Sequence, residues 1–452
     1  MADQQLSKED KSALHAIHSI HVLSQEPNSP LHSATTFEDL HLSKDLLKGI
    51  YNSGFARPSK IQAHSLPMLL KNPPEHLIAQ AQSGTGKTAA FSLAILTRLN
   101  YSDPSTQAII LAPSRELARQ IVEVMKRLAK FTSAVITQVV PESVYRKEPI
   151  EGHVLVGTPG RMTDMITRRI PGTEGGRHAR TFINVSKVGM LILDEADCML
   201  DAQGLGDQSL RIKKFLPNDI QLVFFSATWD EHVIKFADRF TSGSANHIRL
   251  QTYELTLEYV KQFFIDCDDE EDRFRVLIAL YGIMTIAQSI IFVERRDVAE
   301  RIARRMIASG HQVSFLHGGL IPEERDMVMD AFRMAQTKVL VTTNVLARGI
   351  DIERVNMVIN YDLPKTRTGK SDPVTYLHRI GRTGRFGRLG ISVNFVHNPS
   401  SFIALEDIQE YFHSRIARVP TELEQGDRML NDDAEHARLE RMERFFKLAM
   451  KE

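Results

Sequence analysis

The sequence predicts an α/β protein of two tandem domains, each a parallel β-sheet covered by helices, with short helical extensions at both ends. Short continuous apolar runs alternate with helical patterns, as in parallel sheets whose strands are buried on both faces. The alternation breaks off in the polar stretch 241–258 and then starts again. Two domains joined by a short linker explain this restart most simply.

The first domain is expected at residues 37–245. An N-terminal arm and linker, residues 1–36, precede it, with a polar arm at 5–25 that we expect to be helical and a turn-rich segment at 26–36. A run of good helix formers predicts a helix at 88–99. Buried strands are predicted at 76–81, 108–113, 153–158, 188–196 and 221–228.

The second domain is expected at residues 257–430, after a linker at 246–256. A helix follows at 431–452, and its apolar stripe of Leu439, Met442, Phe446 and Ala449 indicates that it packs on this domain. Strands are predicted at 289–294, 312–318, 338–343, 355–362 and 391–397.

Composition limits the classes of function. Lys plus Arg and Asp plus Glu both number 56, so the chain has no general basic coat and would hold a polyanion only in a local groove. No apolar run reaches transmembrane length, and the N-terminus is too polar for a signal peptide. Two distant cysteines, Cys198 and Cys267, indicate a reducing compartment and exclude a disulfide framework or a zinc site.

Residues 81–88, AQSGTGKT, fit a phosphate-binding loop in which Ala81 takes the place of the usual first glycine. Gly84 and Gly86 let backbone N–H groups wrap a phosphate, while Lys87 reaches it and Thr88 ligates Mg²⁺. The loop lies between a strand and a helix, so a phosphate would meet the helix N-terminus. This setting argues against an ordinary flexible loop. The phosphate contacts are expected from Ser83, Gly84, Thr85, Gly86, Lys87 and Thr88.

In the segment LILDEAD, residues 191–197, three carboxylates lie at the end of a buried strand. Asp194 is placed to hold Mg²⁺, directly or through water, and Glu195 to orient or deprotonate an attacking water. The hydroxyls of Ser226 and Thr228, after the next predicted strand, are placed to bond Asp197 or a face of the second domain. Serines and threonines at a strand end are also common turn residues.

The second domain carries the arginine-rich stretch YLHRIGRTGRFGR, residues 376–388. A solvated basic loop is one interpretation. The other is that Arg382 and Arg385 reach a γ-phosphate bound on the first domain, because a planar guanidinium matches phosphate oxygens. Thr342 and Asp351 lie in TTNVLARGID, where we expect contacts to a backbone phosphate and to a ribose.

Taken together, these motifs resemble the DEAD-box RNA helicase family over residues 37–420. The tetrad DEAD stands at 194–197, GFARPSKIQ at 54–62, PSRELA at 113–118, TPGR at 158–161 and HRIGRTGR at 378–385. The resemblance implies two RecA-like domains, ATP with Mg²⁺, and RNA-stimulated ATP hydrolysis. It implies adenine contacts by Gln62 and Phe37, further nucleotide contacts by Gly349 and Asp351, and coupling between domains by Asp197, Ser226, Thr228 and His378.

The same resemblance implies an RNA path across both domains, through phosphates and 2′-hydroxyls. The expected contacts are Pro113, Arg115, Thr158, Gly160, Arg161, His317, Gly318 and Thr342. The basic insertion at 168–182 is placed either to touch RNA or to form a tolerated surface loop.

Within the family the chain is most similar to the nuclear-pore mRNA-export subgroup, and Asn344 in place of the usual Asp fits that subgroup. This similarity implies remodelling of RNA–protein complexes, in the cytoplasm and nucleus, at the cytoplasmic face of the pore. It implies a β-propeller nucleoporin near Arg211, and an activator with inositol hexakisphosphate near Lys447 and Lys451. A monomer is expected. The alternatives are another RNA role, such as translation initiation or termination, a non-catalytic ATP-gated RNA clamp, and a DNA translocase.

Overall fold

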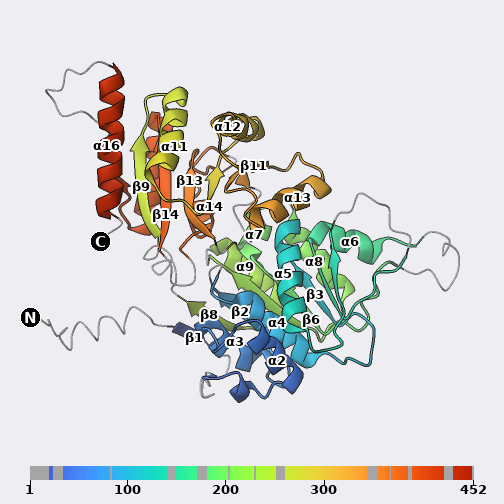
Figure 1. Ribbon diagram of the computed structural model, residues 1–452. Helices are drawn as coiled ribbons and strands as arrows, with labels where there is room; N and C mark the ends of the chain where they lie inside the picture. Colours follow the sequence, from blue (N-terminus) through green and yellow to red (C-terminus); the bar gives the residue numbers. More distant parts are fainter. Residues whose placement is uncertain are drawn as a thin grey trace, which may run out of the picture. The chain divides into compact units, whose positions relative to one another are not determined.

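The chain folds into two compact units, residues 1–252 and 253–452, each with its own sheet (Figure 1). No helix among the described residues is both long and apolar enough to cross a membrane. The structure, a computed structural model, describes residues 20–23, 34–81, 84–140, 148–170, 181–201, 204–228, 231–250, 260–344, 352, 354–366, 368–384, 389–421 and 431–449.

The first unit contains an eight-stranded sheet of order β1-β8-β2-β7-β6-β3-β5-β4. Neighbouring strands pair in parallel, except that β1 pairs antiparallel with β8. The five strands expected for this domain are confirmed. The bounds are β1 Ile20–Leu23, β2 Leu77–Gln80, β3 Ala108–Leu111, β4 Ile136–Val139, β5 Val154–Gly157, β6 Met190–Leu193, β7 Gln221–Ser226 and β8 Asn246–Leu250.

Helices cover both faces of this sheet. Alternate residues of the strands enter two separate cores, so that Leu77 and Ala79 pack in one and Ile78 in the other. Helices α2 (Lys44–Asn52), α3 (Lys60–Leu69), α4 (Lys87–Arg98) and α5 (Arg115–Leu128) cover the first face. The second face is covered by α6 (Pro159–Thr167), α7 (Ala196–Asp201), α8 (Leu205–Phe215) and α9 (Glu231–Thr241).

The second unit contains a seven-stranded parallel sheet of order β11-β12-β10-β13-β14-β9-β15. Its strands are β9 Val260–Asp266, β10 Gln288–Phe292, β11 Val313–Leu316, β12 Val339–Thr342, β13 Val355–Asn360, β14 Gly390–Val396 and β15 Ala417–Arg418. Its helices are α11 Glu270–Ile283, α12 Arg296–Ala308, α13 Pro322–Arg333, α14 Pro373–Ile380, α15 Pro399–Phe412 and α16 Asn431–Ala449.

The C-terminal helix α16 packs on the second unit, as its apolar stripe predicted. Met442 and Phe446 are buried in the core that α11 and α12 share with the sheet. The rings of Phe445 and Phe446 meet the ring of Phe263 on β9 edge-on, with centroids 5.6 and 5.3 Å apart. Apolar packing of one helix face therefore fixes this extension.

Two expectations about the connecting segments are wrong. Residues 20–23 of the N-terminal arm, expected to be helical, form strand β1, whose partner is β8. Residues 246–250, expected to begin the linker, form β8 itself. Among the described side chains of β8, Ile248 is the apolar one that enters the core, and the sequence of this strand lacks the continuous apolar run that marks an internal strand. The rest of the arm lies outside the described residues.

Candidate functional site

The phosphate loop lies at the carboxyl end of β2. Gly84 and Gly86 have positive φ angles, 85° and 99°, which glycine adopts without strain. Lys87 begins α4, and its ammonium is buried without a hydrogen bond to any described residue. A buried, unsatisfied cation beside a helix N-terminus fits a phosphate group. Thr88 follows in the first turn, half-buried, while Ser83 lies outside the described residues.

Gln62 is bonded directly to this loop. Its side-chain oxygen accepts from the backbone N–H of Ser59 at 2.9 Å, and its Nε2 donates to the carbonyl of Gly86 at 3.0 Å. A Cβ at position 86 would come within 2.5 Å of Gln62 Nε2, so only glycine fits. The amide keeps one N–H and one lone pair for a base. The segment expected to bind adenine and the phosphate loop are thus held together by this hydrogen bond of Gln62.

The structure corrects the expected stacking role of Phe37. Its ring is only 1% exposed and belongs to the core of the first unit, so neither face is open to a base. Phe55, in the same segment as Gln62, is half-buried and packs on that core. The sequence analysis missed Phe55, although the motif GFARPSKIQ contains it.

The carboxylates of the DEAD tetrad lie after β6 and are buried. Burial raises the pKa of Asp194 to about 6, against the opposing charge of Lys87. Asp194 Oδ1 accepts from the N–H of Glu195 at 3.0 Å, and Glu195 has a left-handed φ of 51°. A buried carboxyl with a raised pKa, beside two further buried carboxyls, gains from a divalent cation, so these side chains fit Mg²⁺.

The third acid of the tetrad is tied to the end of β7. The hydroxyl of Thr228 donates to Asp197 Oδ2 at 3.2 Å, which is one of the two alternatives that the sequence left open. Ser226 bonds instead to the carbonyl of Thr228 at 2.9 Å. Cys198, which the sequence analysis did not assign to this site, places its sulfur 3.6 Å from Glu195 Oε2. The position of Cys198 directly after the DEAD tetrad was the feature of the sequence that could have indicated this contact.

The expected RNA contacts of the first unit lie along the same edge of the sheet. Arg115 begins α5 after β3, and Thr158 caps α6 after the neighbouring strand β5. Arg161 is held by Asp164, with Nη1 and Oδ2 3.1 Å apart. Pro113 lies in the first of these connections and Gly160 in the first turn of α6, and both are half-buried. Most of the insertion 168–182 lies outside the described residues.

In the second unit, α14 carries His378, and Arg382 follows directly after the helix; both are buried. Arg382 Nε donates to the carbonyl of His378 at 2.9 Å, one helical turn earlier. Gly349, Asp351 and Arg385 lie outside the described residues. This segment therefore presents part of the expected arginine motif, with the guanidinium of Arg382 folded against the helix backbone.

Arg379, on the same helix, is a structural residue that sequence reasoning missed. Its guanidinium donates to the side-chain oxygens of Asn344 and Asn360, each at 3.0 Å, and to the carbonyl of Asp362. Burial lowers its pKa to about 10. The place of Arg379 as the first arginine in HRIGRTGR was the feature of the sequence that could have identified it. It joins α14 to the ends of β12 and β13.

Two of the RNA contacts expected here are corrected. Thr342 is fully buried, and its hydroxyl donates to the carbonyl of Leu316 at 2.8 Å. His317 is also buried, with Nε2 3.0 Å from Glu300 Oε1, while Nδ1 accepts from the N–H of Gly319 at 3.1 Å. Both side chains hold the ends of their strands together, whereas Gly318 is exposed.

The candidate partner residues are at the surface. Arg211 is exposed on α8. A mostly basic cavity of about 530 Å³ surrounds it, lined by Asp207, Leu210, Arg211, Lys213, Lys214, Asn218 and Arg239. Lys447 is exposed on α16 and pairs with Glu443 at 2.5 Å, while Lys451 lies outside the described residues.

Comparisons with known proteins agree with this site. Residues 59–236 match the DEAD/DEAH box helicase family, and residues 272–387 match the helicase conserved C-terminal domain. The ATP-dependent RNA helicase dbp5 of Schizosaccharomyces pombe is 52% identical over 400 residues, which are 88% of this chain and 77% of that protein.

Solved structures of a second relative are also similar. S. cerevisiae Dbp5 bound to RNA and ADP BeF3 aligns with a TM-score of 0.80 at 48% identity, over 90% of this chain and all of that one. A single-residue variant of S. cerevisiae Dbp5, bound to Nup159, a Gle1 variant, IP6 and ADP, aligns with a TM-score of 0.62 at 46% identity, over 91% of this chain and all of that one. The chain therefore belongs to the Dbp5 family of DEAD-box ATP-dependent RNA helicases. It has the tandem RecA-like fold, and its cofactors are ATP and Mg²⁺.

Proposed function

We propose that this helicase remodels RNA–protein complexes during mRNA export, at the cytoplasmic face of the nuclear pore. The observation that supports ATP-driven work most directly is the buried, unsatisfied ammonium of Lys87 acting on the buried carboxyl of Asp194. Such a pair is poorly stabilised without a phosphate and a cation, and it gains from binding both. The export role rests on the similarity to Dbp5 over most of the chain.

In this proposal the first domain, residues 37–245, holds the nucleotide. Gln62 bonds the adenine, and Phe55, in place of Phe37, stacks on it. Lys87 donates to phosphate oxygens, and the backbone of 83–88 wraps them. Thr88 and Asp194 would hold Mg²⁺, which supplies charge neutralisation at the phosphates when bound.

Hydrolysis needs residues of both domains. Glu195 orients the attacking water and accepts its proton, while Arg382 and Arg385 of the second domain, residues 257–430, neutralise the developing charge. Gly349 and Asp351 contact the nucleotide from the second domain. The bond from Thr228 to Asp197 fixes the tetrad, and we propose that Ser226 and His378 take part in the same coupling.

RNA would lie across both domains, bound through phosphates and 2′-hydroxyls. Pro113, Arg115, Thr158, Gly160 and Arg161 supply the contacts of the first domain. The second domain contributes through its exposed backbone at Gly318, because the side chains of His317 and Thr342 are engaged.

The partners follow from those of the relative, whose solved structure includes Nup159, Gle1 and IP6. We propose that a nucleoporin docks at Arg211, and that an activator with inositol hexakisphosphate docks at Lys447 and Lys451. The protein would then act in the cytoplasm and nucleus and concentrate at the pore. Charge complementarity supports this, since an exposed guanidinium and ammonium suit acidic partners.

Replacement in S. pombe tests the export role. The chain is expressed in place of dbp5, and nuclear polyadenylated RNA is imaged. Export at the normal level with the wild type, and nuclear accumulation with Arg211→Glu, would support the proposal. Normal RNA export with an inactive Glu195→Gln chain as the sole copy would refute it and leave a different RNA role, such as translation.

A further inference from the structure

The carboxylate of Glu195, which the proposed mechanism uses to orient water, is bonded by a cysteine. Cys198 lies three residues further along the chain, in α7, and both side chains are buried. Cys198 Sγ is 3.6 Å from Glu195 Oε2 and 3.7 Å from Asp197 Oδ1. Within the described parts of the chain, this thiol is the one hydrogen-bond donor to the side chain of Glu195.

The backbone of Glu195 is also held by the turn that contains Cys198. Among the five non-glycine residues with positive φ in the described segments, Glu195 is the only one that is buried. Its N–H donates to Asp194, as described above, and its carbonyl accepts from the N–H of Cys198 at 3.0 Å. A left-handed conformation of this kind persists only where the surrounding structure holds it. Cys198 therefore contributes to the position of both the backbone and the side chain of Glu195.

The thiol has one hydrogen and two carboxylates within reach. Asp197 already accepts a hydrogen bond from the hydroxyl of Thr228. The side chain of Glu195 has no second donor among the described residues. A hydrogen bond gains most where it satisfies a buried charged group that lacks other partners. The geometry thus favours donation from Cys198 to Glu195.

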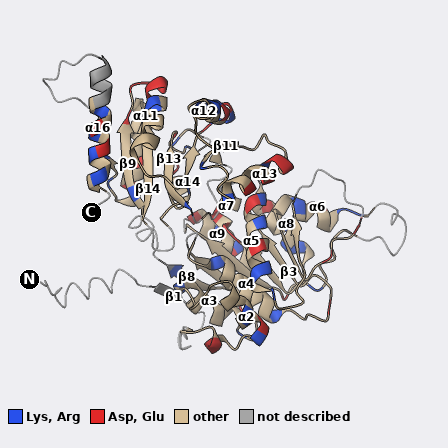
Figure 2. Ribbon diagram, viewed as in Figure 1, with Lys and Arg blue, Asp and Glu red and all other residues tan. Residues whose placement is uncertain are grey.

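The helix that carries this thiol provides no cation for the same task. Figure 2 shows both signs of charge on α11 and α16, whereas the sequence of α7, ADCMLD, contains acidic residues and no Lys or Arg. Lys87 acts on Asp194 instead. A protonated thiol is a weak, uncharged donor, so it orients an ionised carboxylate without an ion pair that would reduce its basicity.

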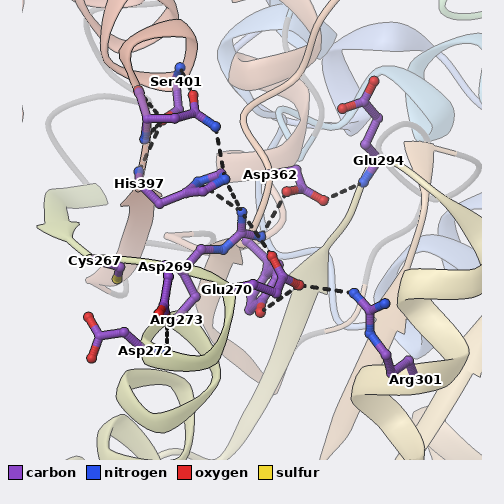
Figure 3. A network of polar contacts seen from close by, with 12 residues as sticks. Cys267, Asp269, Glu270, Asp272, Arg273, Glu294, Arg301, Asp362, His397 and Ser401 are labelled. Carbon is purple, nitrogen blue, oxygen red and sulfur yellow. Dashed lines mark hydrogen bonds and ion pairs between the residues drawn. The ribbon is translucent and has the colours of Figure 1, made fainter.

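The second cysteine of the chain has a different environment. Cys267 is buried, and its Sγ donates to the main-chain carbonyl of Ile265 at 3.8 Å. Burial raises the pKa of Cys267 to about 12. Figure 3 shows Cys267 beside a polar network around Arg273, and no dashed line reaches its sulfur. Cys267 therefore provides a matched control, a buried thiol that is not bonded to a carboxylate of the nucleotide site.

We propose that Cys198 is a positioning residue for ATP hydrolysis, whose thiol holds the carboxylate of Glu195 in the orientation that directs the attacking water. Cys198 acts through Glu195 and does not touch the nucleotide. Its loss therefore affects the turnover rate and leaves the binding of ATP and RNA unchanged. This inference rests on the proposed role of Glu195 and adds a residue outside the motifs that the sequence analysis used.

Steady-state ATPase kinetics with RNA compare Cys198→Ala, Cys198→Ser and the control Cys267→Ser. Cys198→Ala is expected to lower kcat about fivefold, with the KM for ATP and the affinity for RNA unchanged. Cys198→Ser is expected to recover most of this loss, because its hydroxyl keeps a donor. A packing role would give the opposite order, since a buried hydroxyl is less favourable than alanine in an apolar site. Melting temperatures show that each variant folds.

Infrared spectroscopy tests the hydrogen bond itself and does not depend on turnover. The S–H stretching band of Cys198 is obtained as the difference between Cys267→Ser and the double variant that also carries Cys198→Ala. We expect this band to move to higher frequency with Glu195→Gln, because the substitution removes the charge of the acceptor and weakens the bond. Asp197→Asn, the matched change at the other carboxylate, is expected to move it less.

Three results would overturn the inference. A wild-type kcat in Cys198→Ala would show that the thiol does not position Glu195. A kcat that falls together with the melting temperature, with serine no better than alanine, would assign Cys198 to packing. A band that responds to Asp197→Asn and not to Glu195→Gln would place the hydrogen bond on Asp197. Normal turnover in Glu195→Gln would instead refute the proposed role of Glu195 itself.

Discussion

At the scale of residues, the burial of charged groups in the nucleotide site destabilises the ligand-free protein, and bound ligands would offset this. Lys87 and Asp194 are both buried, and burial dominates the raised pKa of Asp194. Between about pH 4 and 6 the native protein binds a proton on Asp194 that the unfolded chain releases, so this group lowers stability as the pH rises through that window. The penalty is fully present above pH 6.

Asp194→Asn should therefore stabilise the protein free of nucleotide and magnesium while abolishing ATP hydrolysis. A shift of roughly two pKa units corresponds to about 3 kcal/mol, an upper bound because Lys87 loses its counter-charge. We expect the gain in melting temperature over wild type to grow from pH 4 to pH 6.5. A gain that is equal at both pH values would mean that Asp194 is not protonated in the native state.

Substitution of two phenylalanines distinguishes a residue that contacts the nucleotide, Phe55, from one that packs in the core, Phe37. Phe55→Ala should raise the KM for ATP about fivefold, the loss of about 1 kcal/mol of stacking, with a small change in stability. Phe37→Ala should cost about 3–5 kcal/mol of folding free energy, because the ring is in the core. Steady-state kinetics and thermal melts measure both. A wild-type KM for ATP in Phe55→Ala would show that Phe55 does not stack on the adenine.

At the scale of elements, a partly buried ion pair adds to the apolar packing of the C-terminal helix. Arg438 on α16 donates to both oxygens of Asp272 on α11, at 2.7 and 3.1 Å. Burial works to raise the pKa of Asp272, but the hydrogen bonds and charge of Arg438 outweigh it, and the pKa falls below its usual value. This pair therefore stabilises the packing of α16 above about pH 4 and is lost in acid.

Arg438→Met should loosen α16 by up to about 3 kcal/mol, since the buried Asp272 then keeps only the 3.5 Å contact with the exposed Arg275 as an ion pair. Lys447→Met on the same helix removes an exposed pair and should cost less than about 0.5 kcal/mol. Amide hydrogen exchange of α16 is the measurement. Similar exchange in the two variants would show that the apolar stripe alone fixes the helix.

The sequence could predict the elements whose signals are local. Buried parallel strands give continuous apolar runs, so β2, β3, β5, β6 and β7 were found. Strand β8 was missed because its sequence, NHIRL, lacks a continuous apolar run, and β1 because its strand character depends on pairing with β8. The positions of Lys87, Asp194 and Gln62 followed from motifs. The burial of Phe37, Thr342 and His317 did not, because a motif names a residue without saying which way it points.

At the scale of the whole molecule, ATP and RNA motifs are divided between two units with independent cores. Nucleotide residues of the first unit gather at the ends of β2 and β6, and its expected RNA residues at the ends of β3 and β5. One sheet edge thus carries both sets. The zero net charge is consistent with RNA binding along such an edge rather than over a general basic surface.

The central claim is that RNA drives ATP turnover through Glu195, and ATPase rate against single-stranded RNA concentration tests it most directly. Wild type and Glu195→Gln are compared with RNA and with DNA of equal sequence, and again with inositol hexakisphosphate and the activator. We predict stimulation by RNA only, further stimulation by the activator, and no turnover in Glu195→Gln despite RNA binding in ATP. Equal rates with and without RNA would contradict the account and indicate a non-catalytic clamp, and equal stimulation by DNA would indicate a translocase.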